Sequence, residues 1–305
     1  MKASLYIIAA LCAGTIMASC SEEKLTAEPE QPRYNVADDP NDAIQHTKFT
    51  MFENYRTYLI TNPTTADYKF NFQQKNNLLI TAPQQSKDLL AKGIARFEKL
   101  FMSVYSEAFK KQYMPFSIIL ADSILFLEQE NGRPSYHAYA ANRFLAMAGV
   151  RPGMENDTDS LLREIKGDIH ARFWVDYMEG INQKFELPQE FFEPSKSYYR
   201  KSADEISVLG DVTGKLPDQI NFHPAGFIMY NRRTTFFDPD PDWGGWWIEA
   251  PDEDTDKRQW IAFVFSTPKA EREAIIAEYP IMKQKYDLLK AAFLKSDNFN
   301  IDLLP

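Results

Sequence analysis

Residues 167–178 of the chain read GDIHARFWVDYM, and this stretch decides the fold because its large side chains follow a helical period. Gly180 is typical of a helix end. The preceding residues DTDSLLREI offer several Asp, Ser and Thr caps. Gly167 either lowers the stability of one long helix by about 1 kcal/mol or divides it into two. The shared helical face consists of His170, Phe173, Trp174, Tyr177 and Ile181.

The first half of the chain mixes strand-like and helical patterns. Residues 86–109 carry apolar side chains at helical spacing. Residues 115–128 hold a short apolar run that ends at Asp122 and predicts a buried strand. Residues 70–82 predict a strand, a turn and a strand, whereas residues 137–150 fit a strand or a helix equally well.

The C-terminal part is more clearly helical. Thr267-Pro268 predicts an N-cap followed by proline at the first helical position. A last helix is indicated by an apolar stripe made of Met282, Tyr286, Leu289 and Phe293. Together these patterns predict an α+β fold with a helix-rich C-terminal half.

The first residues, MKASLYIIAALCAGTIMASCSEEK, have the features of a secretory signal. Lys2 precedes an apolar run that is too short to span a bilayer, and small residues lead to Cys20. Residues 17–20 resemble the lipobox of bacterial lipoproteins, in which the signal is removed and the cysteine is acylated. We therefore expect residues 1–19 to be a signal peptide and Cys20 to anchor the chain to the outer membrane. The alternative is a plain signal peptide with an incidental cysteine.

The residues after Cys20 predict export and a spacer. Ser21-Glu22-Glu23 resembles the signal that sends lipoproteins of the Bacteroidetes to the cell surface. Residues 20–45 are polar with few large apolar groups, which is typical of a flexible tether. We expect residues 46–305 to form the domain, with an α/β lobe at about 46–155 and a helical lobe at about 156–305.

Charge and cysteine content exclude several classes of protein. The net charge is −9, and it becomes −10 when removal of residues 1–19 takes away Lys2 and no acidic residue. Such an acidic protein is a poor candidate for binding nucleic acid. Because Cys12 lies in the signal, only Cys20 remains after its removal, so neither a disulfide nor a cysteine-ligated zinc is possible within that chain.

Four segments resemble the zinc-binding metallopeptidases found among Bacteroidetes lipoproteins, a family with a zincin-like catalytic domain. They cover most of residues 160–304. In order, they are GDIHARFWVDYM, FELPQEFFEPSKSYY, AGFIMY (225–230), and DKRQWIAFVFSTPKAEREAIIAEYP with the closing KQKYDLLKAAFLKSDNFNIDL. The resemblance implies a zincin-like α+β fold.

The catalytic motif of that family does not carry over. Its His-Glu-x-x-His pattern places two zinc-binding histidines one helical turn apart, with a glutamate that activates water. Here His170 is present, but Ala171 stands for the glutamate and Trp174 for the second histidine. Since catalytic zinc needs three protein ligands and alanine cannot accept a proton, we expect a vestigial metal-site helix with His170 as a hydrogen-bonded core residue.

The family's downstream acidic motif is also altered. Aligned on Trp260, its glutamate positions fall on Thr255 and Gln259, with Asp256 between them; a shifted alignment places Glu253 and Asp254 there instead.

The segment FFDPDPDWGGWWIEAPDEDTD (236–256) is the other candidate for a site. Trp243, Trp246 and Trp247 form an aromatic platform for sugars or peptides, or alternatively pack into the core. A calcium loop is suggested weakly by an EF-hand-like spacing, although a solvated acidic loop explains it better. The residues at that spacing are Asp238, Asp240, Asp242 and Glu249.

These patterns favour a non-catalytic surface lipoprotein that binds a peptide, a protein or a glycan and has no cofactor. One alternative is an active zinc peptidase with an atypical site built from His170, His223 and Glu253. Another is a structural accessory lipoprotein of an outer-membrane complex.

Overall fold

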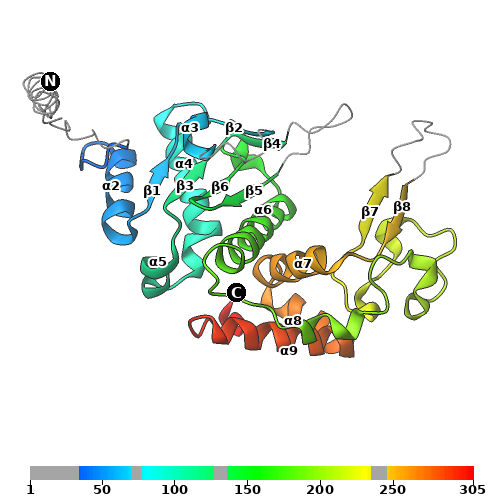
Figure 1. The fold of residues 1–305 in the computed structure, drawn as a ribbon. Coiled ribbons are helices and arrows are strands. Elements are labelled where there is room, and N and C mark those ends of the chain that lie inside the picture. The colour runs from blue at the N-terminus through cyan, green and yellow to red at the C-terminus, as the bar shows by residue number, and fades with distance from the viewer. Residues whose placement is uncertain (1–33, 70–76, 127–135, 235–245) are drawn as a thin grey trace, which may run out of the picture. The chain divides into compact units, whose positions relative to one another are not determined.

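The computed structural model describes residues 34–69, 77–126, 136–234 and 246–305 (Figure 1). The expected signal peptide and Cys20 therefore lie outside the described residues. Residues 36–305 form one compact unit. This unit begins earlier than residue 46, because helix α2 (Ala43–Tyr55) is capped by the Asp42 carboxylate, which accepts hydrogen bonds from the backbone of the first turn.

A four-stranded sheet forms the centre of the N-terminal part. Its order is β1-β3-β6-β5, and β5 occupies one edge. The pairs β1–β3 and β3–β6 are parallel, whereas β5 runs antiparallel to β6. Every residue of β3 and β6 is buried, as expected for apolar strands covered on both faces. The bounds are β1 (Tyr58–Ile60), β3 (Ser117–Leu120), β5 (Ala138–Ala141) and β6 (Phe144–Met147).

The structure confirms that a buried strand ends before Asp122, and it shows that residues 137–150 are a hairpin of two strands. A further strand, β4 (Ser123–Phe126), follows Asp122 and pairs with β2 (Leu78–Thr81) in a second, two-stranded sheet. Residues 70–76 of the predicted strand–turn–strand lie outside the described residues.

The long helix predicted over residues 86–109 is interrupted. Helix α4 (Lys87–Leu100) ends at Phe101, a short 3₁₀ turn η1 (Met102–Val104) follows, and α5 (Glu107–Tyr113) begins after the cap Ser106. Phe101 is fully buried, and its ring stacks on that of His170 with centroids 5.2 Å apart. Tertiary packing of this ring and the Ser106 cap therefore override the helical period.

The segment GDIHARFWVDYM (167–178) lies within one continuous helix. Helix α6 (Asp159–Ala171) is capped by Thr158 and continues into a π-helical segment, η3 (Arg172–Glu179), which ends at Gly180. Helix α6 packs along α7 (Glu253–Ser266), and the two lie side by side in Figure 1. Gly167 does not divide the helix. A Cβ at this position would lie 3.1 Å from the Cβ of Ala262 on α7, so glycine permits the close approach.

The C-terminal helices are α8 (Lys269–Glu278) and α9 (Pro280–Lys295). The predicted stripe on α9 is confirmed, since Met282, Leu289 and Phe293 are buried. Pro268 is itself the N-cap of α8, one position before the place predicted for it. The mixed α+β architecture predicted from the sequence is thus confirmed. Within the described ranges, no helix is long and apolar enough to cross a membrane.

Short elements link α6 to α7 and surround a second, smaller core that includes Phe222 and Phe227. Strands β7 and β8 pair antiparallel. The remaining bounds are α3 (Thr65–Tyr68), η2 (Met154–Asn156), η4 (Gln189–Phe191), η5 (Glu193–Ser195), η6 (Ala203–Glu205), η7 (Ser207–Leu209), η8 (Pro217–Gln219), η9 (His223–Ala225), β7 (Asn231–Thr234), β8 (Trp246–Glu249) and η11 (Ile301–Leu303).

The tight contact between α6 and α7 can be tested with a β-branched residue. Gly167→Val forces atoms into Ala262, so we expect the free energy of unfolding to fall by about 1–3 kcal/mol. The matched control is Glu164→Val on an exposed position of the same helix, which should change stability by less than about 0.5 kcal/mol. Urea denaturation measures both, and equal effects would argue against close packing at Gly167.

Candidate functional site

His170 lies in the core, not in a cleft. It is fully buried, and both ring nitrogens have partners. The Tyr105 hydroxyl lies 2.7 Å from Nδ1, and Nε2 lies 3.0 Å from the Leu100 carbonyl oxygen. Because a carbonyl only accepts, Nε2 carries the proton, and the Tyr105 hydroxyl donates to Nδ1. Trp174 completes the network by donating its indole N–H to the Tyr105 oxygen at 3.0 Å.

The surroundings of His170 keep its ring neutral. The Phe265 ring stacks on it with centroids 4.2 Å apart. Burial, followed by the positive charge of Lys166, holds the pKa of His170 well below its ordinary value. A metal at this ring would have to displace the tyrosine or the carbonyl. Ala171 and Trp174, expected with His170 at the vestigial site, are buried in the same core.

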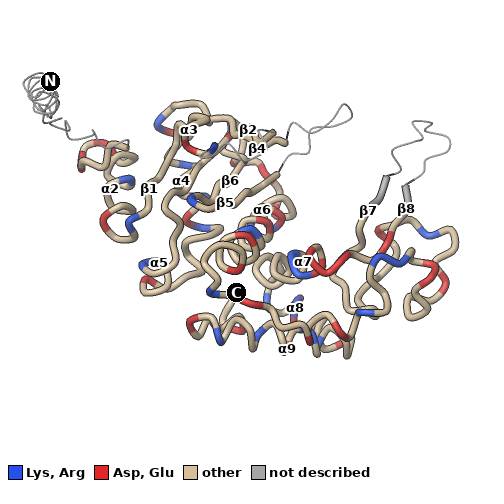
Figure 2. Tube along the Cα trace, in the orientation of Figure 1, with Lys and Arg blue, Asp and Glu red and all other residues tan. Residues whose placement is uncertain are grey.

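The opposite side of the same helix lines an open groove of about 650 Å³. One wall is the edge strand β5 with the following Asn142; the other walls are η3 and the first turns of α7. We call it the β5–α7 groove. Its charged lining consists of Arg172, Asp176, Glu179, Asp254, Lys257 and Arg258. Figure 2 shows acidic and basic positions gathered along the N-terminal part of α7.

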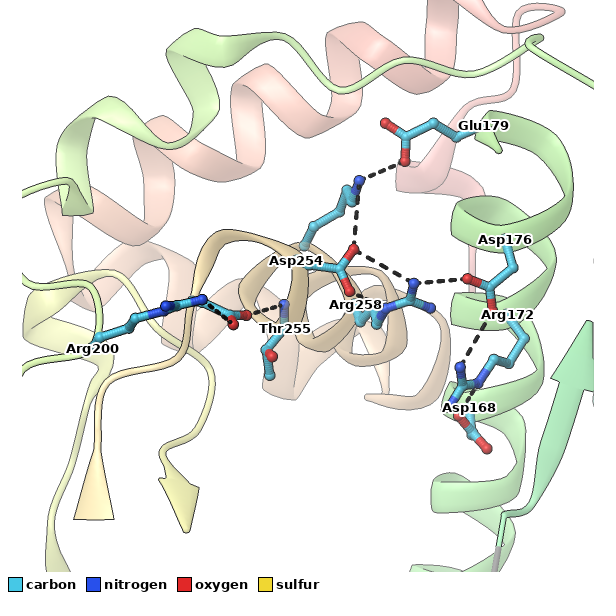
Figure 3. Close-up of polar contacts among 10 residues, drawn as sticks. Asp168, Arg172, Asp176, Glu179, Arg200, Asp254, Thr255 and Arg258 are labelled. Carbon is cyan, nitrogen blue, oxygen red and sulfur yellow. Dashed lines mark hydrogen bonds and ion pairs between the residues drawn. The ribbon is translucent and has the colours of Figure 1, made fainter. Parts of the chain in front are cut away.

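A continuous chain of ion pairs joins these charged residues (Figure 3). Arg172 lies 3.4 Å from Asp168 and 3.3 Å from Asp176 on its own helix. Arg258 crosses from α7 and lies 2.7 Å from both Asp176 and Asp254. The chain therefore ties η3 to α7 at the floor of the groove.

Lys257 extends this chain along the groove. Its ammonium lies 2.7 Å from Glu179 and 3.9 Å from Asp254. Most of these side chains are between one sixth and one quarter exposed, so solvent screens their pairs only in part. Although burial opposes its charge, the hydrogen bonds to Asp176 and Asp254 raise the pKa of Arg258 above its ordinary value. The charges are thus fixed in position and already paired.

Asp168 fastens the helix to the sheet. Its Oδ2 accepts a hydrogen bond from the backbone N–H of Ala138 at 2.9 Å. Burial raises the pKa of Asp168, while Arg172 opposes that rise. The bond shows that Ala138 directs its N–H away from β6. Because backbone groups alternate along an antiparallel strand, the N–H and C=O of Ala140 also point away from β6, on the side of the groove.

The π-helical segment sets where the groove-lining charges lie. π-Helical turns are rare and frequently occur at functional sites. Bonds such as Gly180 N–H to the Val175 carbonyl at 3.0 Å widen the turn. The segment buries Phe173, Trp174 and Tyr177 on one side and presents Arg172 and Asp176 on the other.

The helix places the two positions aligned with the metal-binding histidines, His170 and Trp174, away from the groove. Four residues apart, Asp168 and the groove-lining Arg172 are an acid and a guanidinium that pair with each other. The residues two further on, His170 and Trp174, face the core. The sequence carried a signal for this: charges recur every four residues at Asp168, Arg172 and Asp176.

The other sites expected from the sequence are not brought together with His170. His223 forms η9 and lies with its ring 5.5 Å from that of Tyr279, and burial lowers its pKa. Glu253 begins α7 and is exposed. Among the residues that the structure describes, no three His, Cys, Asp or Glu side chains are grouped closely enough to hold a metal ion.

The acidic, tryptophan-rich segment is described only in part. Trp246 and Trp247 begin strand β8, while Trp243 lies outside the described residues. Of the candidate calcium ligands, Glu249 ends β8 and is buried. The other three, Asp238, Asp240 and Asp242, lie outside the described residues. The platform and the calcium loop both stay predictions.

Comparison with known proteins gives one similar fold. No family model matches the chain, and no curated protein is similar to it. A solved structure described as a "putative zinc-binding metallo-peptidase" from Bacteroides caccae is 16% identical and has a TM-score of 0.49. The similarity covers 88% of this chain and 91% of that one.

The buried, neutral His170 predicts a pH dependence of stability. Below its unfolded-state pKa of about 6.5, the unfolded chain takes up a proton that the folded chain excludes. The free energy of unfolding should therefore fall by about 1.4 kcal/mol for each pH unit below that value, until the folded-state pKa is reached.

Chemical denaturation at about pH 7 and about pH 5.5 measures this slope. His170→Gln removes the titrating ring and should flatten it. An unchanged slope in His170→Gln would contradict the burial of a neutral imidazole.

Proposed function

We propose that the chain is a non-catalytic binding protein that holds an extended peptide in the β5–α7 groove. The observation that carries this proposal is the ion pair between Asp168 and the groove-lining Arg172. At the spacing of one turn, a zinc peptidase needs two imidazoles. A guanidinium cannot bind a metal cation, and its carboxylate neighbour is already bonded to Arg172 and to the Ala138 amide.

The edge strand supports a peptide as the ligand. A sheet edge presents backbone donors and acceptors to which an extended chain adds as a further strand. In β5 only Tyr139 is partly exposed, and Ala140 lines the groove although it is itself only 6% exposed. Ala140 directs both groups to the outside of the sheet. Asp168 occupies the neighbouring position at Ala138, so an added strand would pair from Ala140 onward. The groove beside it has room for the alternate side chains of such a peptide.

The paired charges of the groove support binding over catalysis. Side chains held in ion pairs need little reordering when a ligand arrives, which lowers the entropic cost of binding. The same pairing leaves Asp176 and Asp254 bonded to Arg258, so neither carboxylate is available as a general base.

We further propose, from the sequence, that acylated Cys20 anchors this binding domain at the outer membrane facing outward. The tryptophan-rich segment is a second candidate surface, with sugars as the alternative ligand. The remaining alternative is a structural accessory of an outer-membrane complex. In that role the chain would bind a protein partner, and no free peptide would occupy the groove.

Metal analysis separates the proposal from an active zinc peptidase. We expect protein incubated with zinc and then desalted to contain well below one zinc per chain by mass spectrometry of the metal. His170→Ala and His223→Ala should not change this content. Stoichiometric zinc in the wild type, lost in either variant, would show that the atypical catalytic site exists.

Blocking the Ala140 backbone N–H tests the peptide groove. Peptides selected from a displayed random library on the wild-type protein serve as probes. Ala140→Pro removes an N–H that points away from β6, so the sheet should persist, while peptide affinity should fall roughly tenfold, equivalent to about 1.4 kcal/mol.

The matched control is Ala140→Gly, which keeps the N–H and should bind within about threefold of the wild type. Circular dichroism checks that both variants fold. Equal peptide binding by Ala140→Pro and the wild type would exclude strand addition at β5.

A further inference from the structure

A buried polar cluster lies where α7 meets α9, away from the β5–α7 groove. Lys285 and Asp256 are both fully buried, and the Lys285 Nζ lies 2.5 Å from Asp256 Oδ2. The Tyr199 hydroxyl donates to the same oxygen at 2.6 Å. Ser195 Oγ accepts a long hydrogen bond from Nζ at 3.4 Å and donates to the Ala225 carbonyl at 2.8 Å.

Aromatic rings enclose the ammonium of Lys285. Its Nζ lies 4.5 Å from the ring centre of Phe191, 5.2 Å from that of Phe227 and 5.7 Å from that of Trp260. Gly226, with φ of +85°, closes the remaining side; a Cβ there would lie 2.5 Å from Ser195 Oγ. The amine is therefore held against the carboxyl group in a dry, rigid compartment.

Charges are poorly supported in this compartment. Asp256 Oδ1 is buried and, among the described residues, has no hydrogen-bond partner. Taking both groups out of water carries a large desolvation cost, which their attraction only partly offsets. Burial raises the pKa of Asp256 and lowers that of Lys285, so the neutral acid and the neutral amine gain relative to the ion pair.

We propose that Lys285 and Asp256 condense to an intramolecular isopeptide bond between α7 and α9. A neutral lysine amine is a nucleophile, and a rigid site gives it a very high effective concentration at the carboxyl carbon. The groups start at hydrogen-bond distance, and no segment needs to move far to join them.

The reaction balances without any further reactant. The Nζ lone pair attacks Asp256 Cγ, and a C–N bond forms as the Cγ–Oδ2 bond breaks. Oδ2 leaves as water with the two protons that the ammonium gives up, and Oδ1 becomes the amide carbonyl oxygen. No group is oxidised or reduced.

Neighbouring residues fit the steps of this condensation. The Tyr199 hydroxyl lies on the departing oxygen, where it can pass a proton to it. Tyr199 also lines a surface pocket of about 390 Å³, which gives the released water a way out. The amide N–H of the product can donate to Ser195 Oγ, and the product removes both buried charges.

Tryptic digestion of the denatured full-length protein tests the proposal by mass spectrometry. We expect no cleavage after Lys285 and a linked pair of peptides, residues 234–257 and 284–290, lighter than their sum by one water molecule. Lys285→Met and Asp256→Ala should release the partner peptide unlinked. Cleavage after Lys285 in the wild-type digest, with unmodified masses, overturns the proposal even if both variants fail to fold.

The same digest contains its own control. The Lys257 ammonium lies 2.7 Å from Glu179, but this pair is partly exposed, so it should remain unlinked. A water loss at Lys257 as well would show that proximity alone, without burial, produces the signal and would contradict the mechanism. Tyr199→Phe keeps the ring but lacks the hydroxyl, and it should form the link more slowly after refolding; an unchanged rate removes Tyr199 from the reaction.

Discussion

The burial of His170 fixes the rotation of the α6–η3 helix about its own axis, and the groove depends on that rotation. The imidazole is tied to Tyr105 and to the Leu100 carbonyl, and it stacks on Phe265. A helix held at this point cannot turn another face to the sheet edge. Consequently Arg172 and Asp176, on the far side, line the groove.

Two ionic clusters on α7 differ in their exposure to solvent, and this difference governs what each can do. At the groove, Arg258 joins Asp176 and Asp254 where water still reaches the side chains, so the charges persist and hold two helices together. At the other cluster, Lys285 and Asp256 are cut off from water, and burial works against their charges. The first cluster orders a binding surface, whereas the second favours the proposed isopeptide bond between Lys285 and Asp256.

The sequence predicted those helices in which apolar side chains recur at helical spacing along most of the helix. The face from His170 to Tyr177 and the stripe on α9 are both buried as expected, because long-range packing in these helices agrees with local spacing, whereas Ile181 lies past the helix end in a turn and lines the groove. The break in residues 86–109 was not predictable, because burial of Phe101 against His170 is a contact between segments far apart in the sequence.

The candidate site was only partly predictable for a similar reason. The spacing singled out the helix that lines the groove, with His170 expected in the core, but it did not single out Arg172 and Asp176 as groove-lining residues. The Asp168 bond to Ala138 joins this helix to the sheet edge, and nothing in the spacing of one segment encodes that pairing. The partners of Asp256 and Lys285 lie on separate helices, so no local pattern announced their contact.

Zinc titration of two variants of the α6–η3 helix tests the orientation of that helix most directly. The double variant Asp168→His with Arg172→His places two imidazoles one turn apart, and Asp176 follows one turn beyond them. The single variant Trp174→His instead places a second imidazole beside that of His170 in the core. The structure predicts that calorimetry detects one bound zinc in the double variant and none in Trp174→His. Zinc bound by Trp174→His but not by the double variant would contradict the orientation of the helix and the groove built upon it.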